Sequence, residues 1–293
     1  MQTSPAFVAF VPETSMYRYR QNVLRILVFC TLAVSAMYLG ACAAKQPPPP
    51  SKAECTQAVT TPPQNFDPQT LPLLKECAAT NDKDAHRTLG WVYWKGVKIP
   101  TDTDQALIHF EQAAALGDPH ALEFLSIIYQ QGIRVETDMP RAIQYLEQRA
   151  HAGDLEAAED LGYLYLHDKR IDSDPEKSIA WYEHAAQQEH PHSLYALGRL
   201  YTTGEFVPPN HTLAIAYLQR AAQQKHPGAM AQLAYLYSES EHIEHDLIEA
   251  YTWAHAATLV GMSRSATPID ALEPRLNAQE TVDAREAAET RIR

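Results

Sequence analysis

Residues 85–96 read AHRTLGWVYWKG, and the same pattern returns every 36 residues along the 293-residue chain. In each copy a small residue stands at the first position, leucine at the fifth, another small residue at the sixth and tyrosine at the ninth. The leucine column is Leu89, Leu125, Leu161, Leu197 and Leu233. Copies without any drift in spacing predict a repeat protein in which one structural unit recurs.

Each unit is predicted to form two helices. In the first half, Ala85, Leu89, Val92 and Tyr93 have the spacing of one face of a helix. Three units place a glycine after this helix, where a left-handed C-cap suits glycine; these are Gly96, Gly132 and Gly204. The second half opens with an aspartate or asparagine, a residue type that caps helix N-termini. This column is Asp102, Asp138, Asp174, Asn210 and Asp246.

A period of this size built from helix pairs predicts an all-α, TPR-like solenoid of stacked antiparallel pairs. The pattern A-x-x-x-L-G-x-x-Y-x-x-G followed by D-x-x-x-A, over residues 85–261, resembles the Sel-one-like repeat (SLR), a longer relative of the tetratricopeptide repeat. That resemblance implies an adaptor that binds other proteins, often in bacterial envelopes and signalling complexes. The expected units are a degenerate half-repeat (53–84), five repeats (85–120, 121–156, 157–192, 193–228 and 229–264) and a C-terminal capping helix within 265–293.

The N-terminal region has the features of an export signal. Arginines at 18, 20 and 25 precede an apolar run from Ile26 to Met37, and small residues then lead to Cys42. This order is typical of a secretory signal peptide, here expected over residues 1–41. The residues before Met16 add nothing to it, so Met16 is an alternative start.

Leu39-Gly40-Ala41-Cys42 resembles the bacterial lipobox, which implies cleavage before Cys42 and lipidation of its thiol. Ala43 follows, and by the sorting pattern of Gram-negative lipoproteins this implies the outer membrane. Residues 42–52 then form a proline-rich spacer. The alternative is an uncleaved anchor, because the uncharged run from Ile26 to Ala44 is long enough to span a bilayer.

Two cysteines remain after Cys30 is removed with the signal and Cys42 is lipidated. An even remainder in an oxidising compartment predicts one disulfide, between Cys55 and Cys77. Neither cysteine belongs to a C-x-x-C pair or to a zinc-type spacing.

Charge and motifs exclude several classes of function. Lys+Arg 24 against Asp+Glu 36 gives a net charge of −12, which disfavours a nucleic-acid binder. The chain contains no H-E-x-x-H, no G-x-S-x-G and no Gly-rich phosphate loop. His190 and His226 occupy the polar turn column of Asp118 and Asp154, so repeat drift explains them without a metal. We therefore expect no metal, no cofactor and no enzymatic activity.

The first helices of TPR-like stacks line a concave wall, so we expect a partner to bind at their variable positions. Aromatic residues and arginine, which dominate interface energies, gather there. The candidate groove consists of Trp91, Trp94, Phe124, Ile127, Tyr163, Tyr195, Arg199 and Tyr235. The alternative is that Trp91, Tyr163 and Tyr235 only pack against neighbouring units.

Together these features predict a lipid-anchored outer-membrane protein, facing the periplasm, that acts as a scaffold for protein partners in the cell envelope. A peptidoglycan-binding or wall-modifying factor is the main alternative. A purely structural envelope protein without a specific ligand is the third hypothesis.

Overall fold

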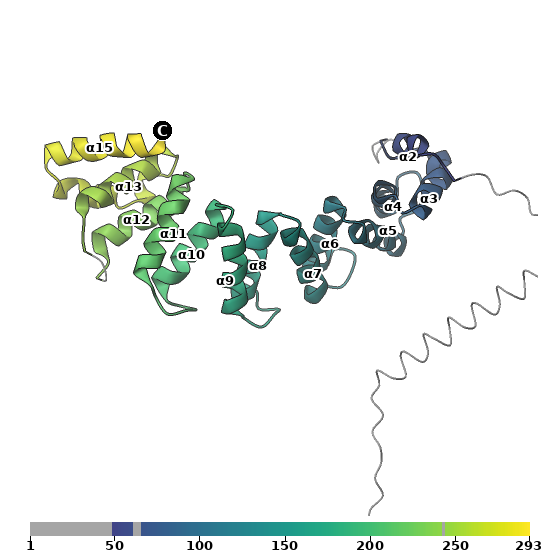
Figure 1. The fold of residues 1–293 in the computed structure, drawn as a ribbon, viewed down its shortest axis with the longest axis horizontal. Helices are drawn as coiled ribbons and strands as arrows, with labels where there is room; N and C mark the ends of the chain where they lie inside the picture. Colours follow the sequence, from purple (N-terminus) through teal and green to yellow (C-terminus); the bar gives the residue numbers. More distant parts are fainter. Residues whose placement is uncertain (1–48, 61–65, 242–243) are drawn as a thin grey trace, which may run out of the picture. The chain divides into compact units, whose positions relative to one another are not determined.

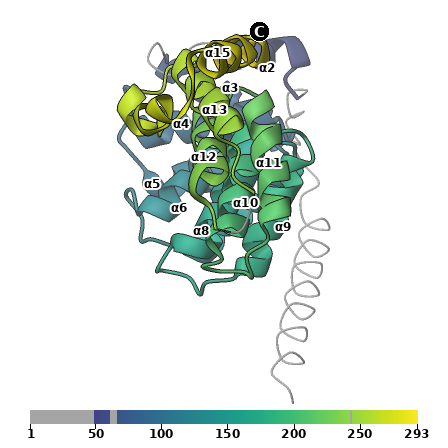
Figure 2. The same cartoon turned by 90° about the vertical axis from the view of Figure 1, so that its left-hand side faces the viewer.

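The computed structural model describes residues 49–60, 66–241 and 244–293, and every regular element within these ranges is a helix. Five helix pairs follow one another along the chain (Figures 1 and 2). They are α4 (Lys83–Lys95) with α5 (Thr103–Ala115), α6 (Pro119–Gln131) with α7 (Met139–His151), α8 (Leu155–His167) with α9 (Pro175–Ala186), α10 (Pro191–Thr203) with α11 (His211–Gln223), and α12 (Pro227–Glu239) with α13 (Leu247–Leu259). The predicted all-α solenoid of 36-residue helix pairs is confirmed.

Each helix packs against the next, so the second helix of one pair also contacts the first helix of the following pair. The core runs along this stack. The five leucines of the repeat column are completely buried. A β-carbon added at Gly162 would lie 2.7 Å from the Tyr182 ring, and one added at Gly198 would lie 2.6 Å from Leu218. The small residue after each leucine therefore lets the two helices of a pair approach closely.

Side-chain caps define where the helices begin and end. Asp102 accepts a hydrogen bond from the Gln105 amide at 3.0 Å, and its counterparts in the other four units cap their helices in the same way. The amide of Asp102 in turn donates to the carbonyl of Tyr93 at 3.0 Å, a bond repeated in every unit. Gly96, with φ +65°, ends its helix in the left-handed conformation, as do Gly132 and Gly204. Both predicted capping columns are confirmed.

Further helices flank the five pairs within the compact unit Pro50–Arg293. Before the pairs lie α2 (Lys52–Val59), the 3-10 turn η2 (Pro68–Thr70) and α3 (Leu71–Ala79); after them come η3 (Arg264–Ala266), α14 (Ile269–Leu272), η4 (Glu273–Arg275) and α15 (Ala278–Ile292). A disulfide joins Cys55 of α2 to Cys77 of α3. At the other end α15 packs along α13 (Figure 1). Within the described ranges, none of the helices combines the length and the apolar character that a membrane crossing needs.

Candidate functional site

One column of the repeat lies on the exposed side of the first helices, α4, α6, α8, α10 and α12. Its members are Trp91, Ile127, Tyr163, Arg199 and Tyr235. We call the surface that carries them the first-helix face. Tyr163 is 58% exposed and Tyr235 50% exposed, whereas Trp91 is half-buried. The same column therefore contributes to packing in one unit and to the surface in others.

A hollow of about 470 Å³ lies on this face between α4 and α6. Trp91, Phe124 and Ile127 line it, together with Arg87, His120 and Glu123. Trp91 also packs against Phe124, with ring centroids 4.6 Å apart, so it both lines the hollow and joins two units. Trp94, by contrast, is buried: its ring packs edge-on against Phe124 and under the guanidinium of Arg134.

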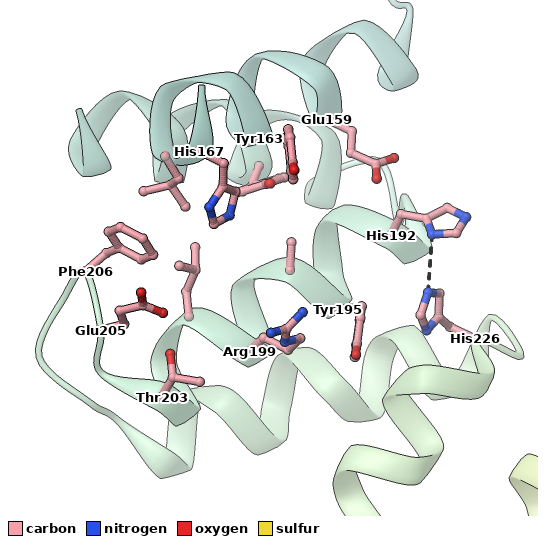
Figure 3. Close-up of a pocket in the computed structure, with 14 residues that line it drawn as sticks. Glu159, Tyr163, His167, His192, Tyr195, Arg199, Thr203, Glu205, Phe206 and His226 are labelled. Carbon is pink, nitrogen blue, oxygen red and sulfur yellow. Dashed lines mark hydrogen bonds between the residues drawn. The ribbon is translucent and has the colours of Figure 1, made fainter. Parts of the chain in front are cut away.

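A second hollow, of about 450 Å³, lies between α8 and α10 and is shown in Figure 3. It brings together three residues of the candidate groove, Tyr163, Tyr195 and Arg199. Tyr195 is half-buried because its ring stacks on His226, with centroids 4.5 Å apart. Tyr235 lines neither of these two hollows.

The hollow between α8 and α10 also contains residues that the sequence analysis did not select. His167, Glu205 and Phe206 are the main ones, and the Phe206 ring meets His167 edge-on at 5.6 Å. The equivalents of Phe206 reach back one unit in the same way: Arg134 donates to the carbonyl of Trp94, and Arg170 to that of Gln130. In the turn column Lys98, Arg134, Arg170, Phe206 and His242, Phe206 is the one member without a basic side chain. That exception was the signal available in the sequence.

Two histidines at the edge of this hollow are joined by a hydrogen bond. His226 Nε2 lies 3.2 Å from His192 Nδ1 (Figure 3). His226 Nδ1 accepts the amide of Ala229 at 3.1 Å, which caps α12 and leaves the proton on Nε2. Burial, and then the neighbouring His192, lower the pKa of His226 to about 4, so its ring is neutral at pH 7. Both nitrogens of His226 are therefore engaged in hydrogen bonds, which leaves neither free to bind a metal.

No group of three His, Cys, Asp or Glu side chains is placed to hold a metal ion in the described part of the chain. A smaller hollow of about 260 Å³ is lined by Glu156, Glu159, Asp160, His190 and His192. Burial raises the pKa of both Glu159 and Asp160. The described residues that line this hollow include no hydroxyl, thiol or amine nucleophile, and the raised pKa values follow from their position at a junction between units.

The predicted lipidation site, Cys42, lies outside the described residues, as do the export signal and most of the proline-rich spacer. Cys55 and Cys77 lie at the N-terminal end of the stack, away from the two hollows.

Comparison with known families and structures agrees with this architecture. The Sel1 repeat family matches residues 83–118, 119–154, 155–190, 191–226 and 227–261. The fold is similar to that of a protective antigen of uropathogenic Escherichia coli strains with an SLR fold (TM-score 0.56, 24% identity, 76% of this chain and 48% of that protein). It is also similar to a Sel1 repeat protein from Oxalobacter formigenes (TM-score 0.51, 24% identity, 76% of this chain and 93% of that protein). The match thus spans about half the length of the E. coli protein, and at these identities the likeness concerns the fold alone. The search of curated proteins found no match.

Proposed function

The chain belongs to the Sel1 repeat family, whose members generally bind protein partners, and we propose that it acts as an adaptor that binds its partners through the first-helix face. The helix pairs hold this face in one conformation before a partner arrives. A preorganised surface loses less conformational entropy on binding, so more of the contact energy appears as affinity.

The exposure of Tyr163 and Tyr235 is the observation that carries this proposal. More than half of the Tyr163 surface and half of the Tyr235 surface remain accessible to solvent. A residue in this column is able to pack against the next unit, because Trp91 packs against Phe124. Stability of the solenoid comes from the buried leucine and alanine columns, which these two rings do not join. Large aromatic side chains that packing does not require are the residues that supply most of the energy at protein interfaces.

A pull-down tests the proposal. The full chain and its Tyr163→Ala/Tyr235→Ala variant are used to capture proteins from solubilised envelopes. The matched control is Ile108→Ala/Ile248→Ala, because these side chains are 49% and 43% exposed but lie on second helices. We expect a defined protein to be retained by the chain and by the control and lost with the tyrosine variant. Equal capture by all three would contradict the proposal.

Binding to the cell wall is the competing function, and purified sacculi distinguish it. The wall-binding function would be favoured over the adaptor function by two results together. These are that the Tyr163→Ala/Tyr235→Ala variant still co-sediments with sacculi and that the pull-down captures no protein. Absence of co-sedimentation removes that alternative.

We further propose that the adaptor is anchored in the outer membrane by lipid on Cys42, with the helical stack on the periplasmic side. The order of arginines, apolar run, small residues and cysteine supports this proposal. Several acyl chains on one cysteine give stable anchoring, because each buried methylene contributes about 0.8 kcal/mol. The prolines at 47–50 would then separate the stack from the bilayer.

A further inference from the structure

Arg199 differs from the other arginines of the five helix pairs in having no acceptor. Its counterparts each donate to a protein oxygen: Arg87 to Asp118, Arg134 to the Trp94 carbonyl, Arg141 to Tyr129, Arg149 to Asp154, Arg170 to Asp168 and Arg220 to Glu189. Among the described residues, Arg199 forms neither an ion pair nor a hydrogen bond, and its guanidinium lies 5.9 Å from the centre of the Tyr195 ring. Its donors are therefore available to a ligand.

Arg199 is an exposed residue that lines the hollow between α8 and α10. Tyr163 and Phe206 supply apolar walls, and Tyr195 lies beneath the charge. A hydrogen bond from a charged guanidinium to a carboxylate is stronger than one between neutral groups. Arginine matches a carboxylate in particular, since its planar fork donates two parallel hydrogen bonds.

Two carboxylates lie on opposite sides of Arg199 along the hollow, Glu159 at one end and Glu205 at the other (Figure 3). Glu159 approaches His190, with Oε2 3.8 Å from Nδ1, and neither glutamate is paired with Arg199. The charges thus alternate from negative to positive to negative. The hollow continues past Arg199 in both directions, so a bound chain can pass through it and need not end there.

We infer that this hollow binds an extended segment of a partner protein that presents an Asp or Glu side chain to Arg199, next to an apolar or aromatic side chain that packs against the row of rings formed by Tyr163, His167 and Phe206. This inference rests on the proposed adaptor function. Basic residues on either side of the bound carboxylate would face Glu159 and Glu205. They also fit the net charge of −12, which repels a uniformly acidic partner. A cell-wall stem peptide carries carboxylates but lacks a large apolar side chain to pack against these rings.

The test begins with a library of displayed 12-residue peptides selected on the full chain. One enriched peptide is synthesised with both ends blocked, once with its acidic residue and once with the corresponding Asp→Asn or Glu→Gln change. Dissociation constants are measured for the native chain, Arg199→Gln, Arg199→Lys and Arg275→Gln. Arg275 is the matched control, because it is exposed on η4 and its loss changes the net charge equally.

We expect the enriched peptides to share an acidic residue beside an apolar one. Arg199→Gln should weaken the acidic peptide about ten- to a hundredfold, as for a lost charge-assisted hydrogen bond, and barely affect the amide peptide. Arg199→Lys should recover part of the loss, and Arg275→Gln should change nothing. The effects of Arg199→Gln and of the acid-to-amide change on the dissociation constant would then be non-additive, which shows that Arg199 contacts the carboxylate of the peptide.

Three results would overturn the inference. In the first, Tyr163→Ala or Tyr235→Ala weakens binding of the enriched peptides but Arg199→Gln does not. That result would support the adaptor function and rule out the carboxylate site. Peptides that bind without sensitivity to any of these changes would remove both. Displacement of the peptide by a purified disaccharide-tetrapeptide muropeptide at similar concentration would assign the hollow to the cell wall instead.

Discussion

Tyr195 stacks on His226, with ring centroids 4.5 Å apart and ring planes inclined by 28°, and this contact joins the fourth repeat to the N-cap of the fifth. The positions equivalent to Tyr195 and His226 in an earlier part of the stack are Arg87 and Asp118, and they form a different type of contact. Arg87 Nη1 lies 2.6 Å from the carboxylate of Asp118, which is the N-cap of α6. A charged pair in the first repeat is thus replaced by an aromatic stack in the fourth, next to the hollow that contains Arg199.

His226 makes the last repeats sensitive to acid. Its pKa is lowered from 6.5 to about 4, so its contribution to stability is complete above pH 6.5 and is lost as the pH falls from 6.5 through 4. Protonation also removes the acceptor that caps α12 at the Ala229 amide. His226→Asp should replace this cap by a carboxylate, the capping group that Asp118 and Asp154 supply to α6 and α8, and the pKa of a free aspartate is only about 3.9.

Urea unfolding at pH 7 and pH 5 checks this expectation. The difference in unfolding free energy between His226→Asp and the native chain should shift in favour of the variant by about 1 kcal/mol, after allowing for solvent screening at a half-buried site. Burial also lowers the pKa values of His86 and His190. Both histidines are present in the native chain and in the variant, so their contributions cancel in the difference between the two unfolding free energies. If the difference in unfolding free energy between variant and native chain is the same at pH 7 and pH 5, the acid sensitivity does not come from His226.

Gly162 is a site where the spacing between two helices of a pair should be sensitive to an added methyl group. A β-carbon there would lie 2.7 Å from the ring of Tyr182, which is itself buried. Gly162→Ala should therefore destabilise the chain by about 1–3 kcal/mol, although alanine is the better helix former. Gly117→Ala is the comparison, because its added carbon meets no neighbour and its effect comes only from the positive φ of +75°. Calorimetric unfolding of both variants distinguishes a steric effect from a backbone effect, and a stabilised Gly162→Ala would refute the close approach.

The disulfide should stabilise the N-terminal end of the stack. Cys55 and Cys77 are 22 residues apart, and closing a loop of this size contributes about 3 kcal/mol in chain-entropy terms. Cys55→Ala/Cys77→Ala should increase hydrogen exchange in α2 and α3 and leave α12 and α13 unchanged, since coupling in a solenoid passes between neighbours. Increased exchange throughout the chain would show that the stack unfolds as a single unit.

Lipidation has a direct test. When cells that express the chain are grown with a fatty acid analogue, the chain should become labelled. The label should be absent from the Cys42→Ala variant. A Cys55→Ala/Cys77→Ala variant should remain labelled, because these cysteines form the disulfide of the folded stack. Label that persists in Cys42→Ala would place the modification elsewhere and remove the proposed anchor.

Most of the fold could be predicted because its signals repeat. Asp102 and its counterparts cap helices through a bond to an amide three residues on, and Gly96 ends a helix through its own backbone angles. Such effects act within one unit, and the repeat displays each of them several times. The candidate groove was only partly predictable: Tyr163 and Arg199 share a hollow, while Trp94 is buried beneath Arg134.

The sequence by itself determined the repeat length, the helix pairs, their caps and the buried columns, because these depend on spacing and side-chain chemistry inside one unit. The tertiary structure alone decided which aromatic side chains remain on the surface. Trp91 and Tyr163 occupy the same column, yet Phe124 from the next unit covers Trp91, while the equivalent residue beside Tyr163 is Ala196. Exposure here depends on the size of a side chain one unit away, and that contact exists only once the units have stacked.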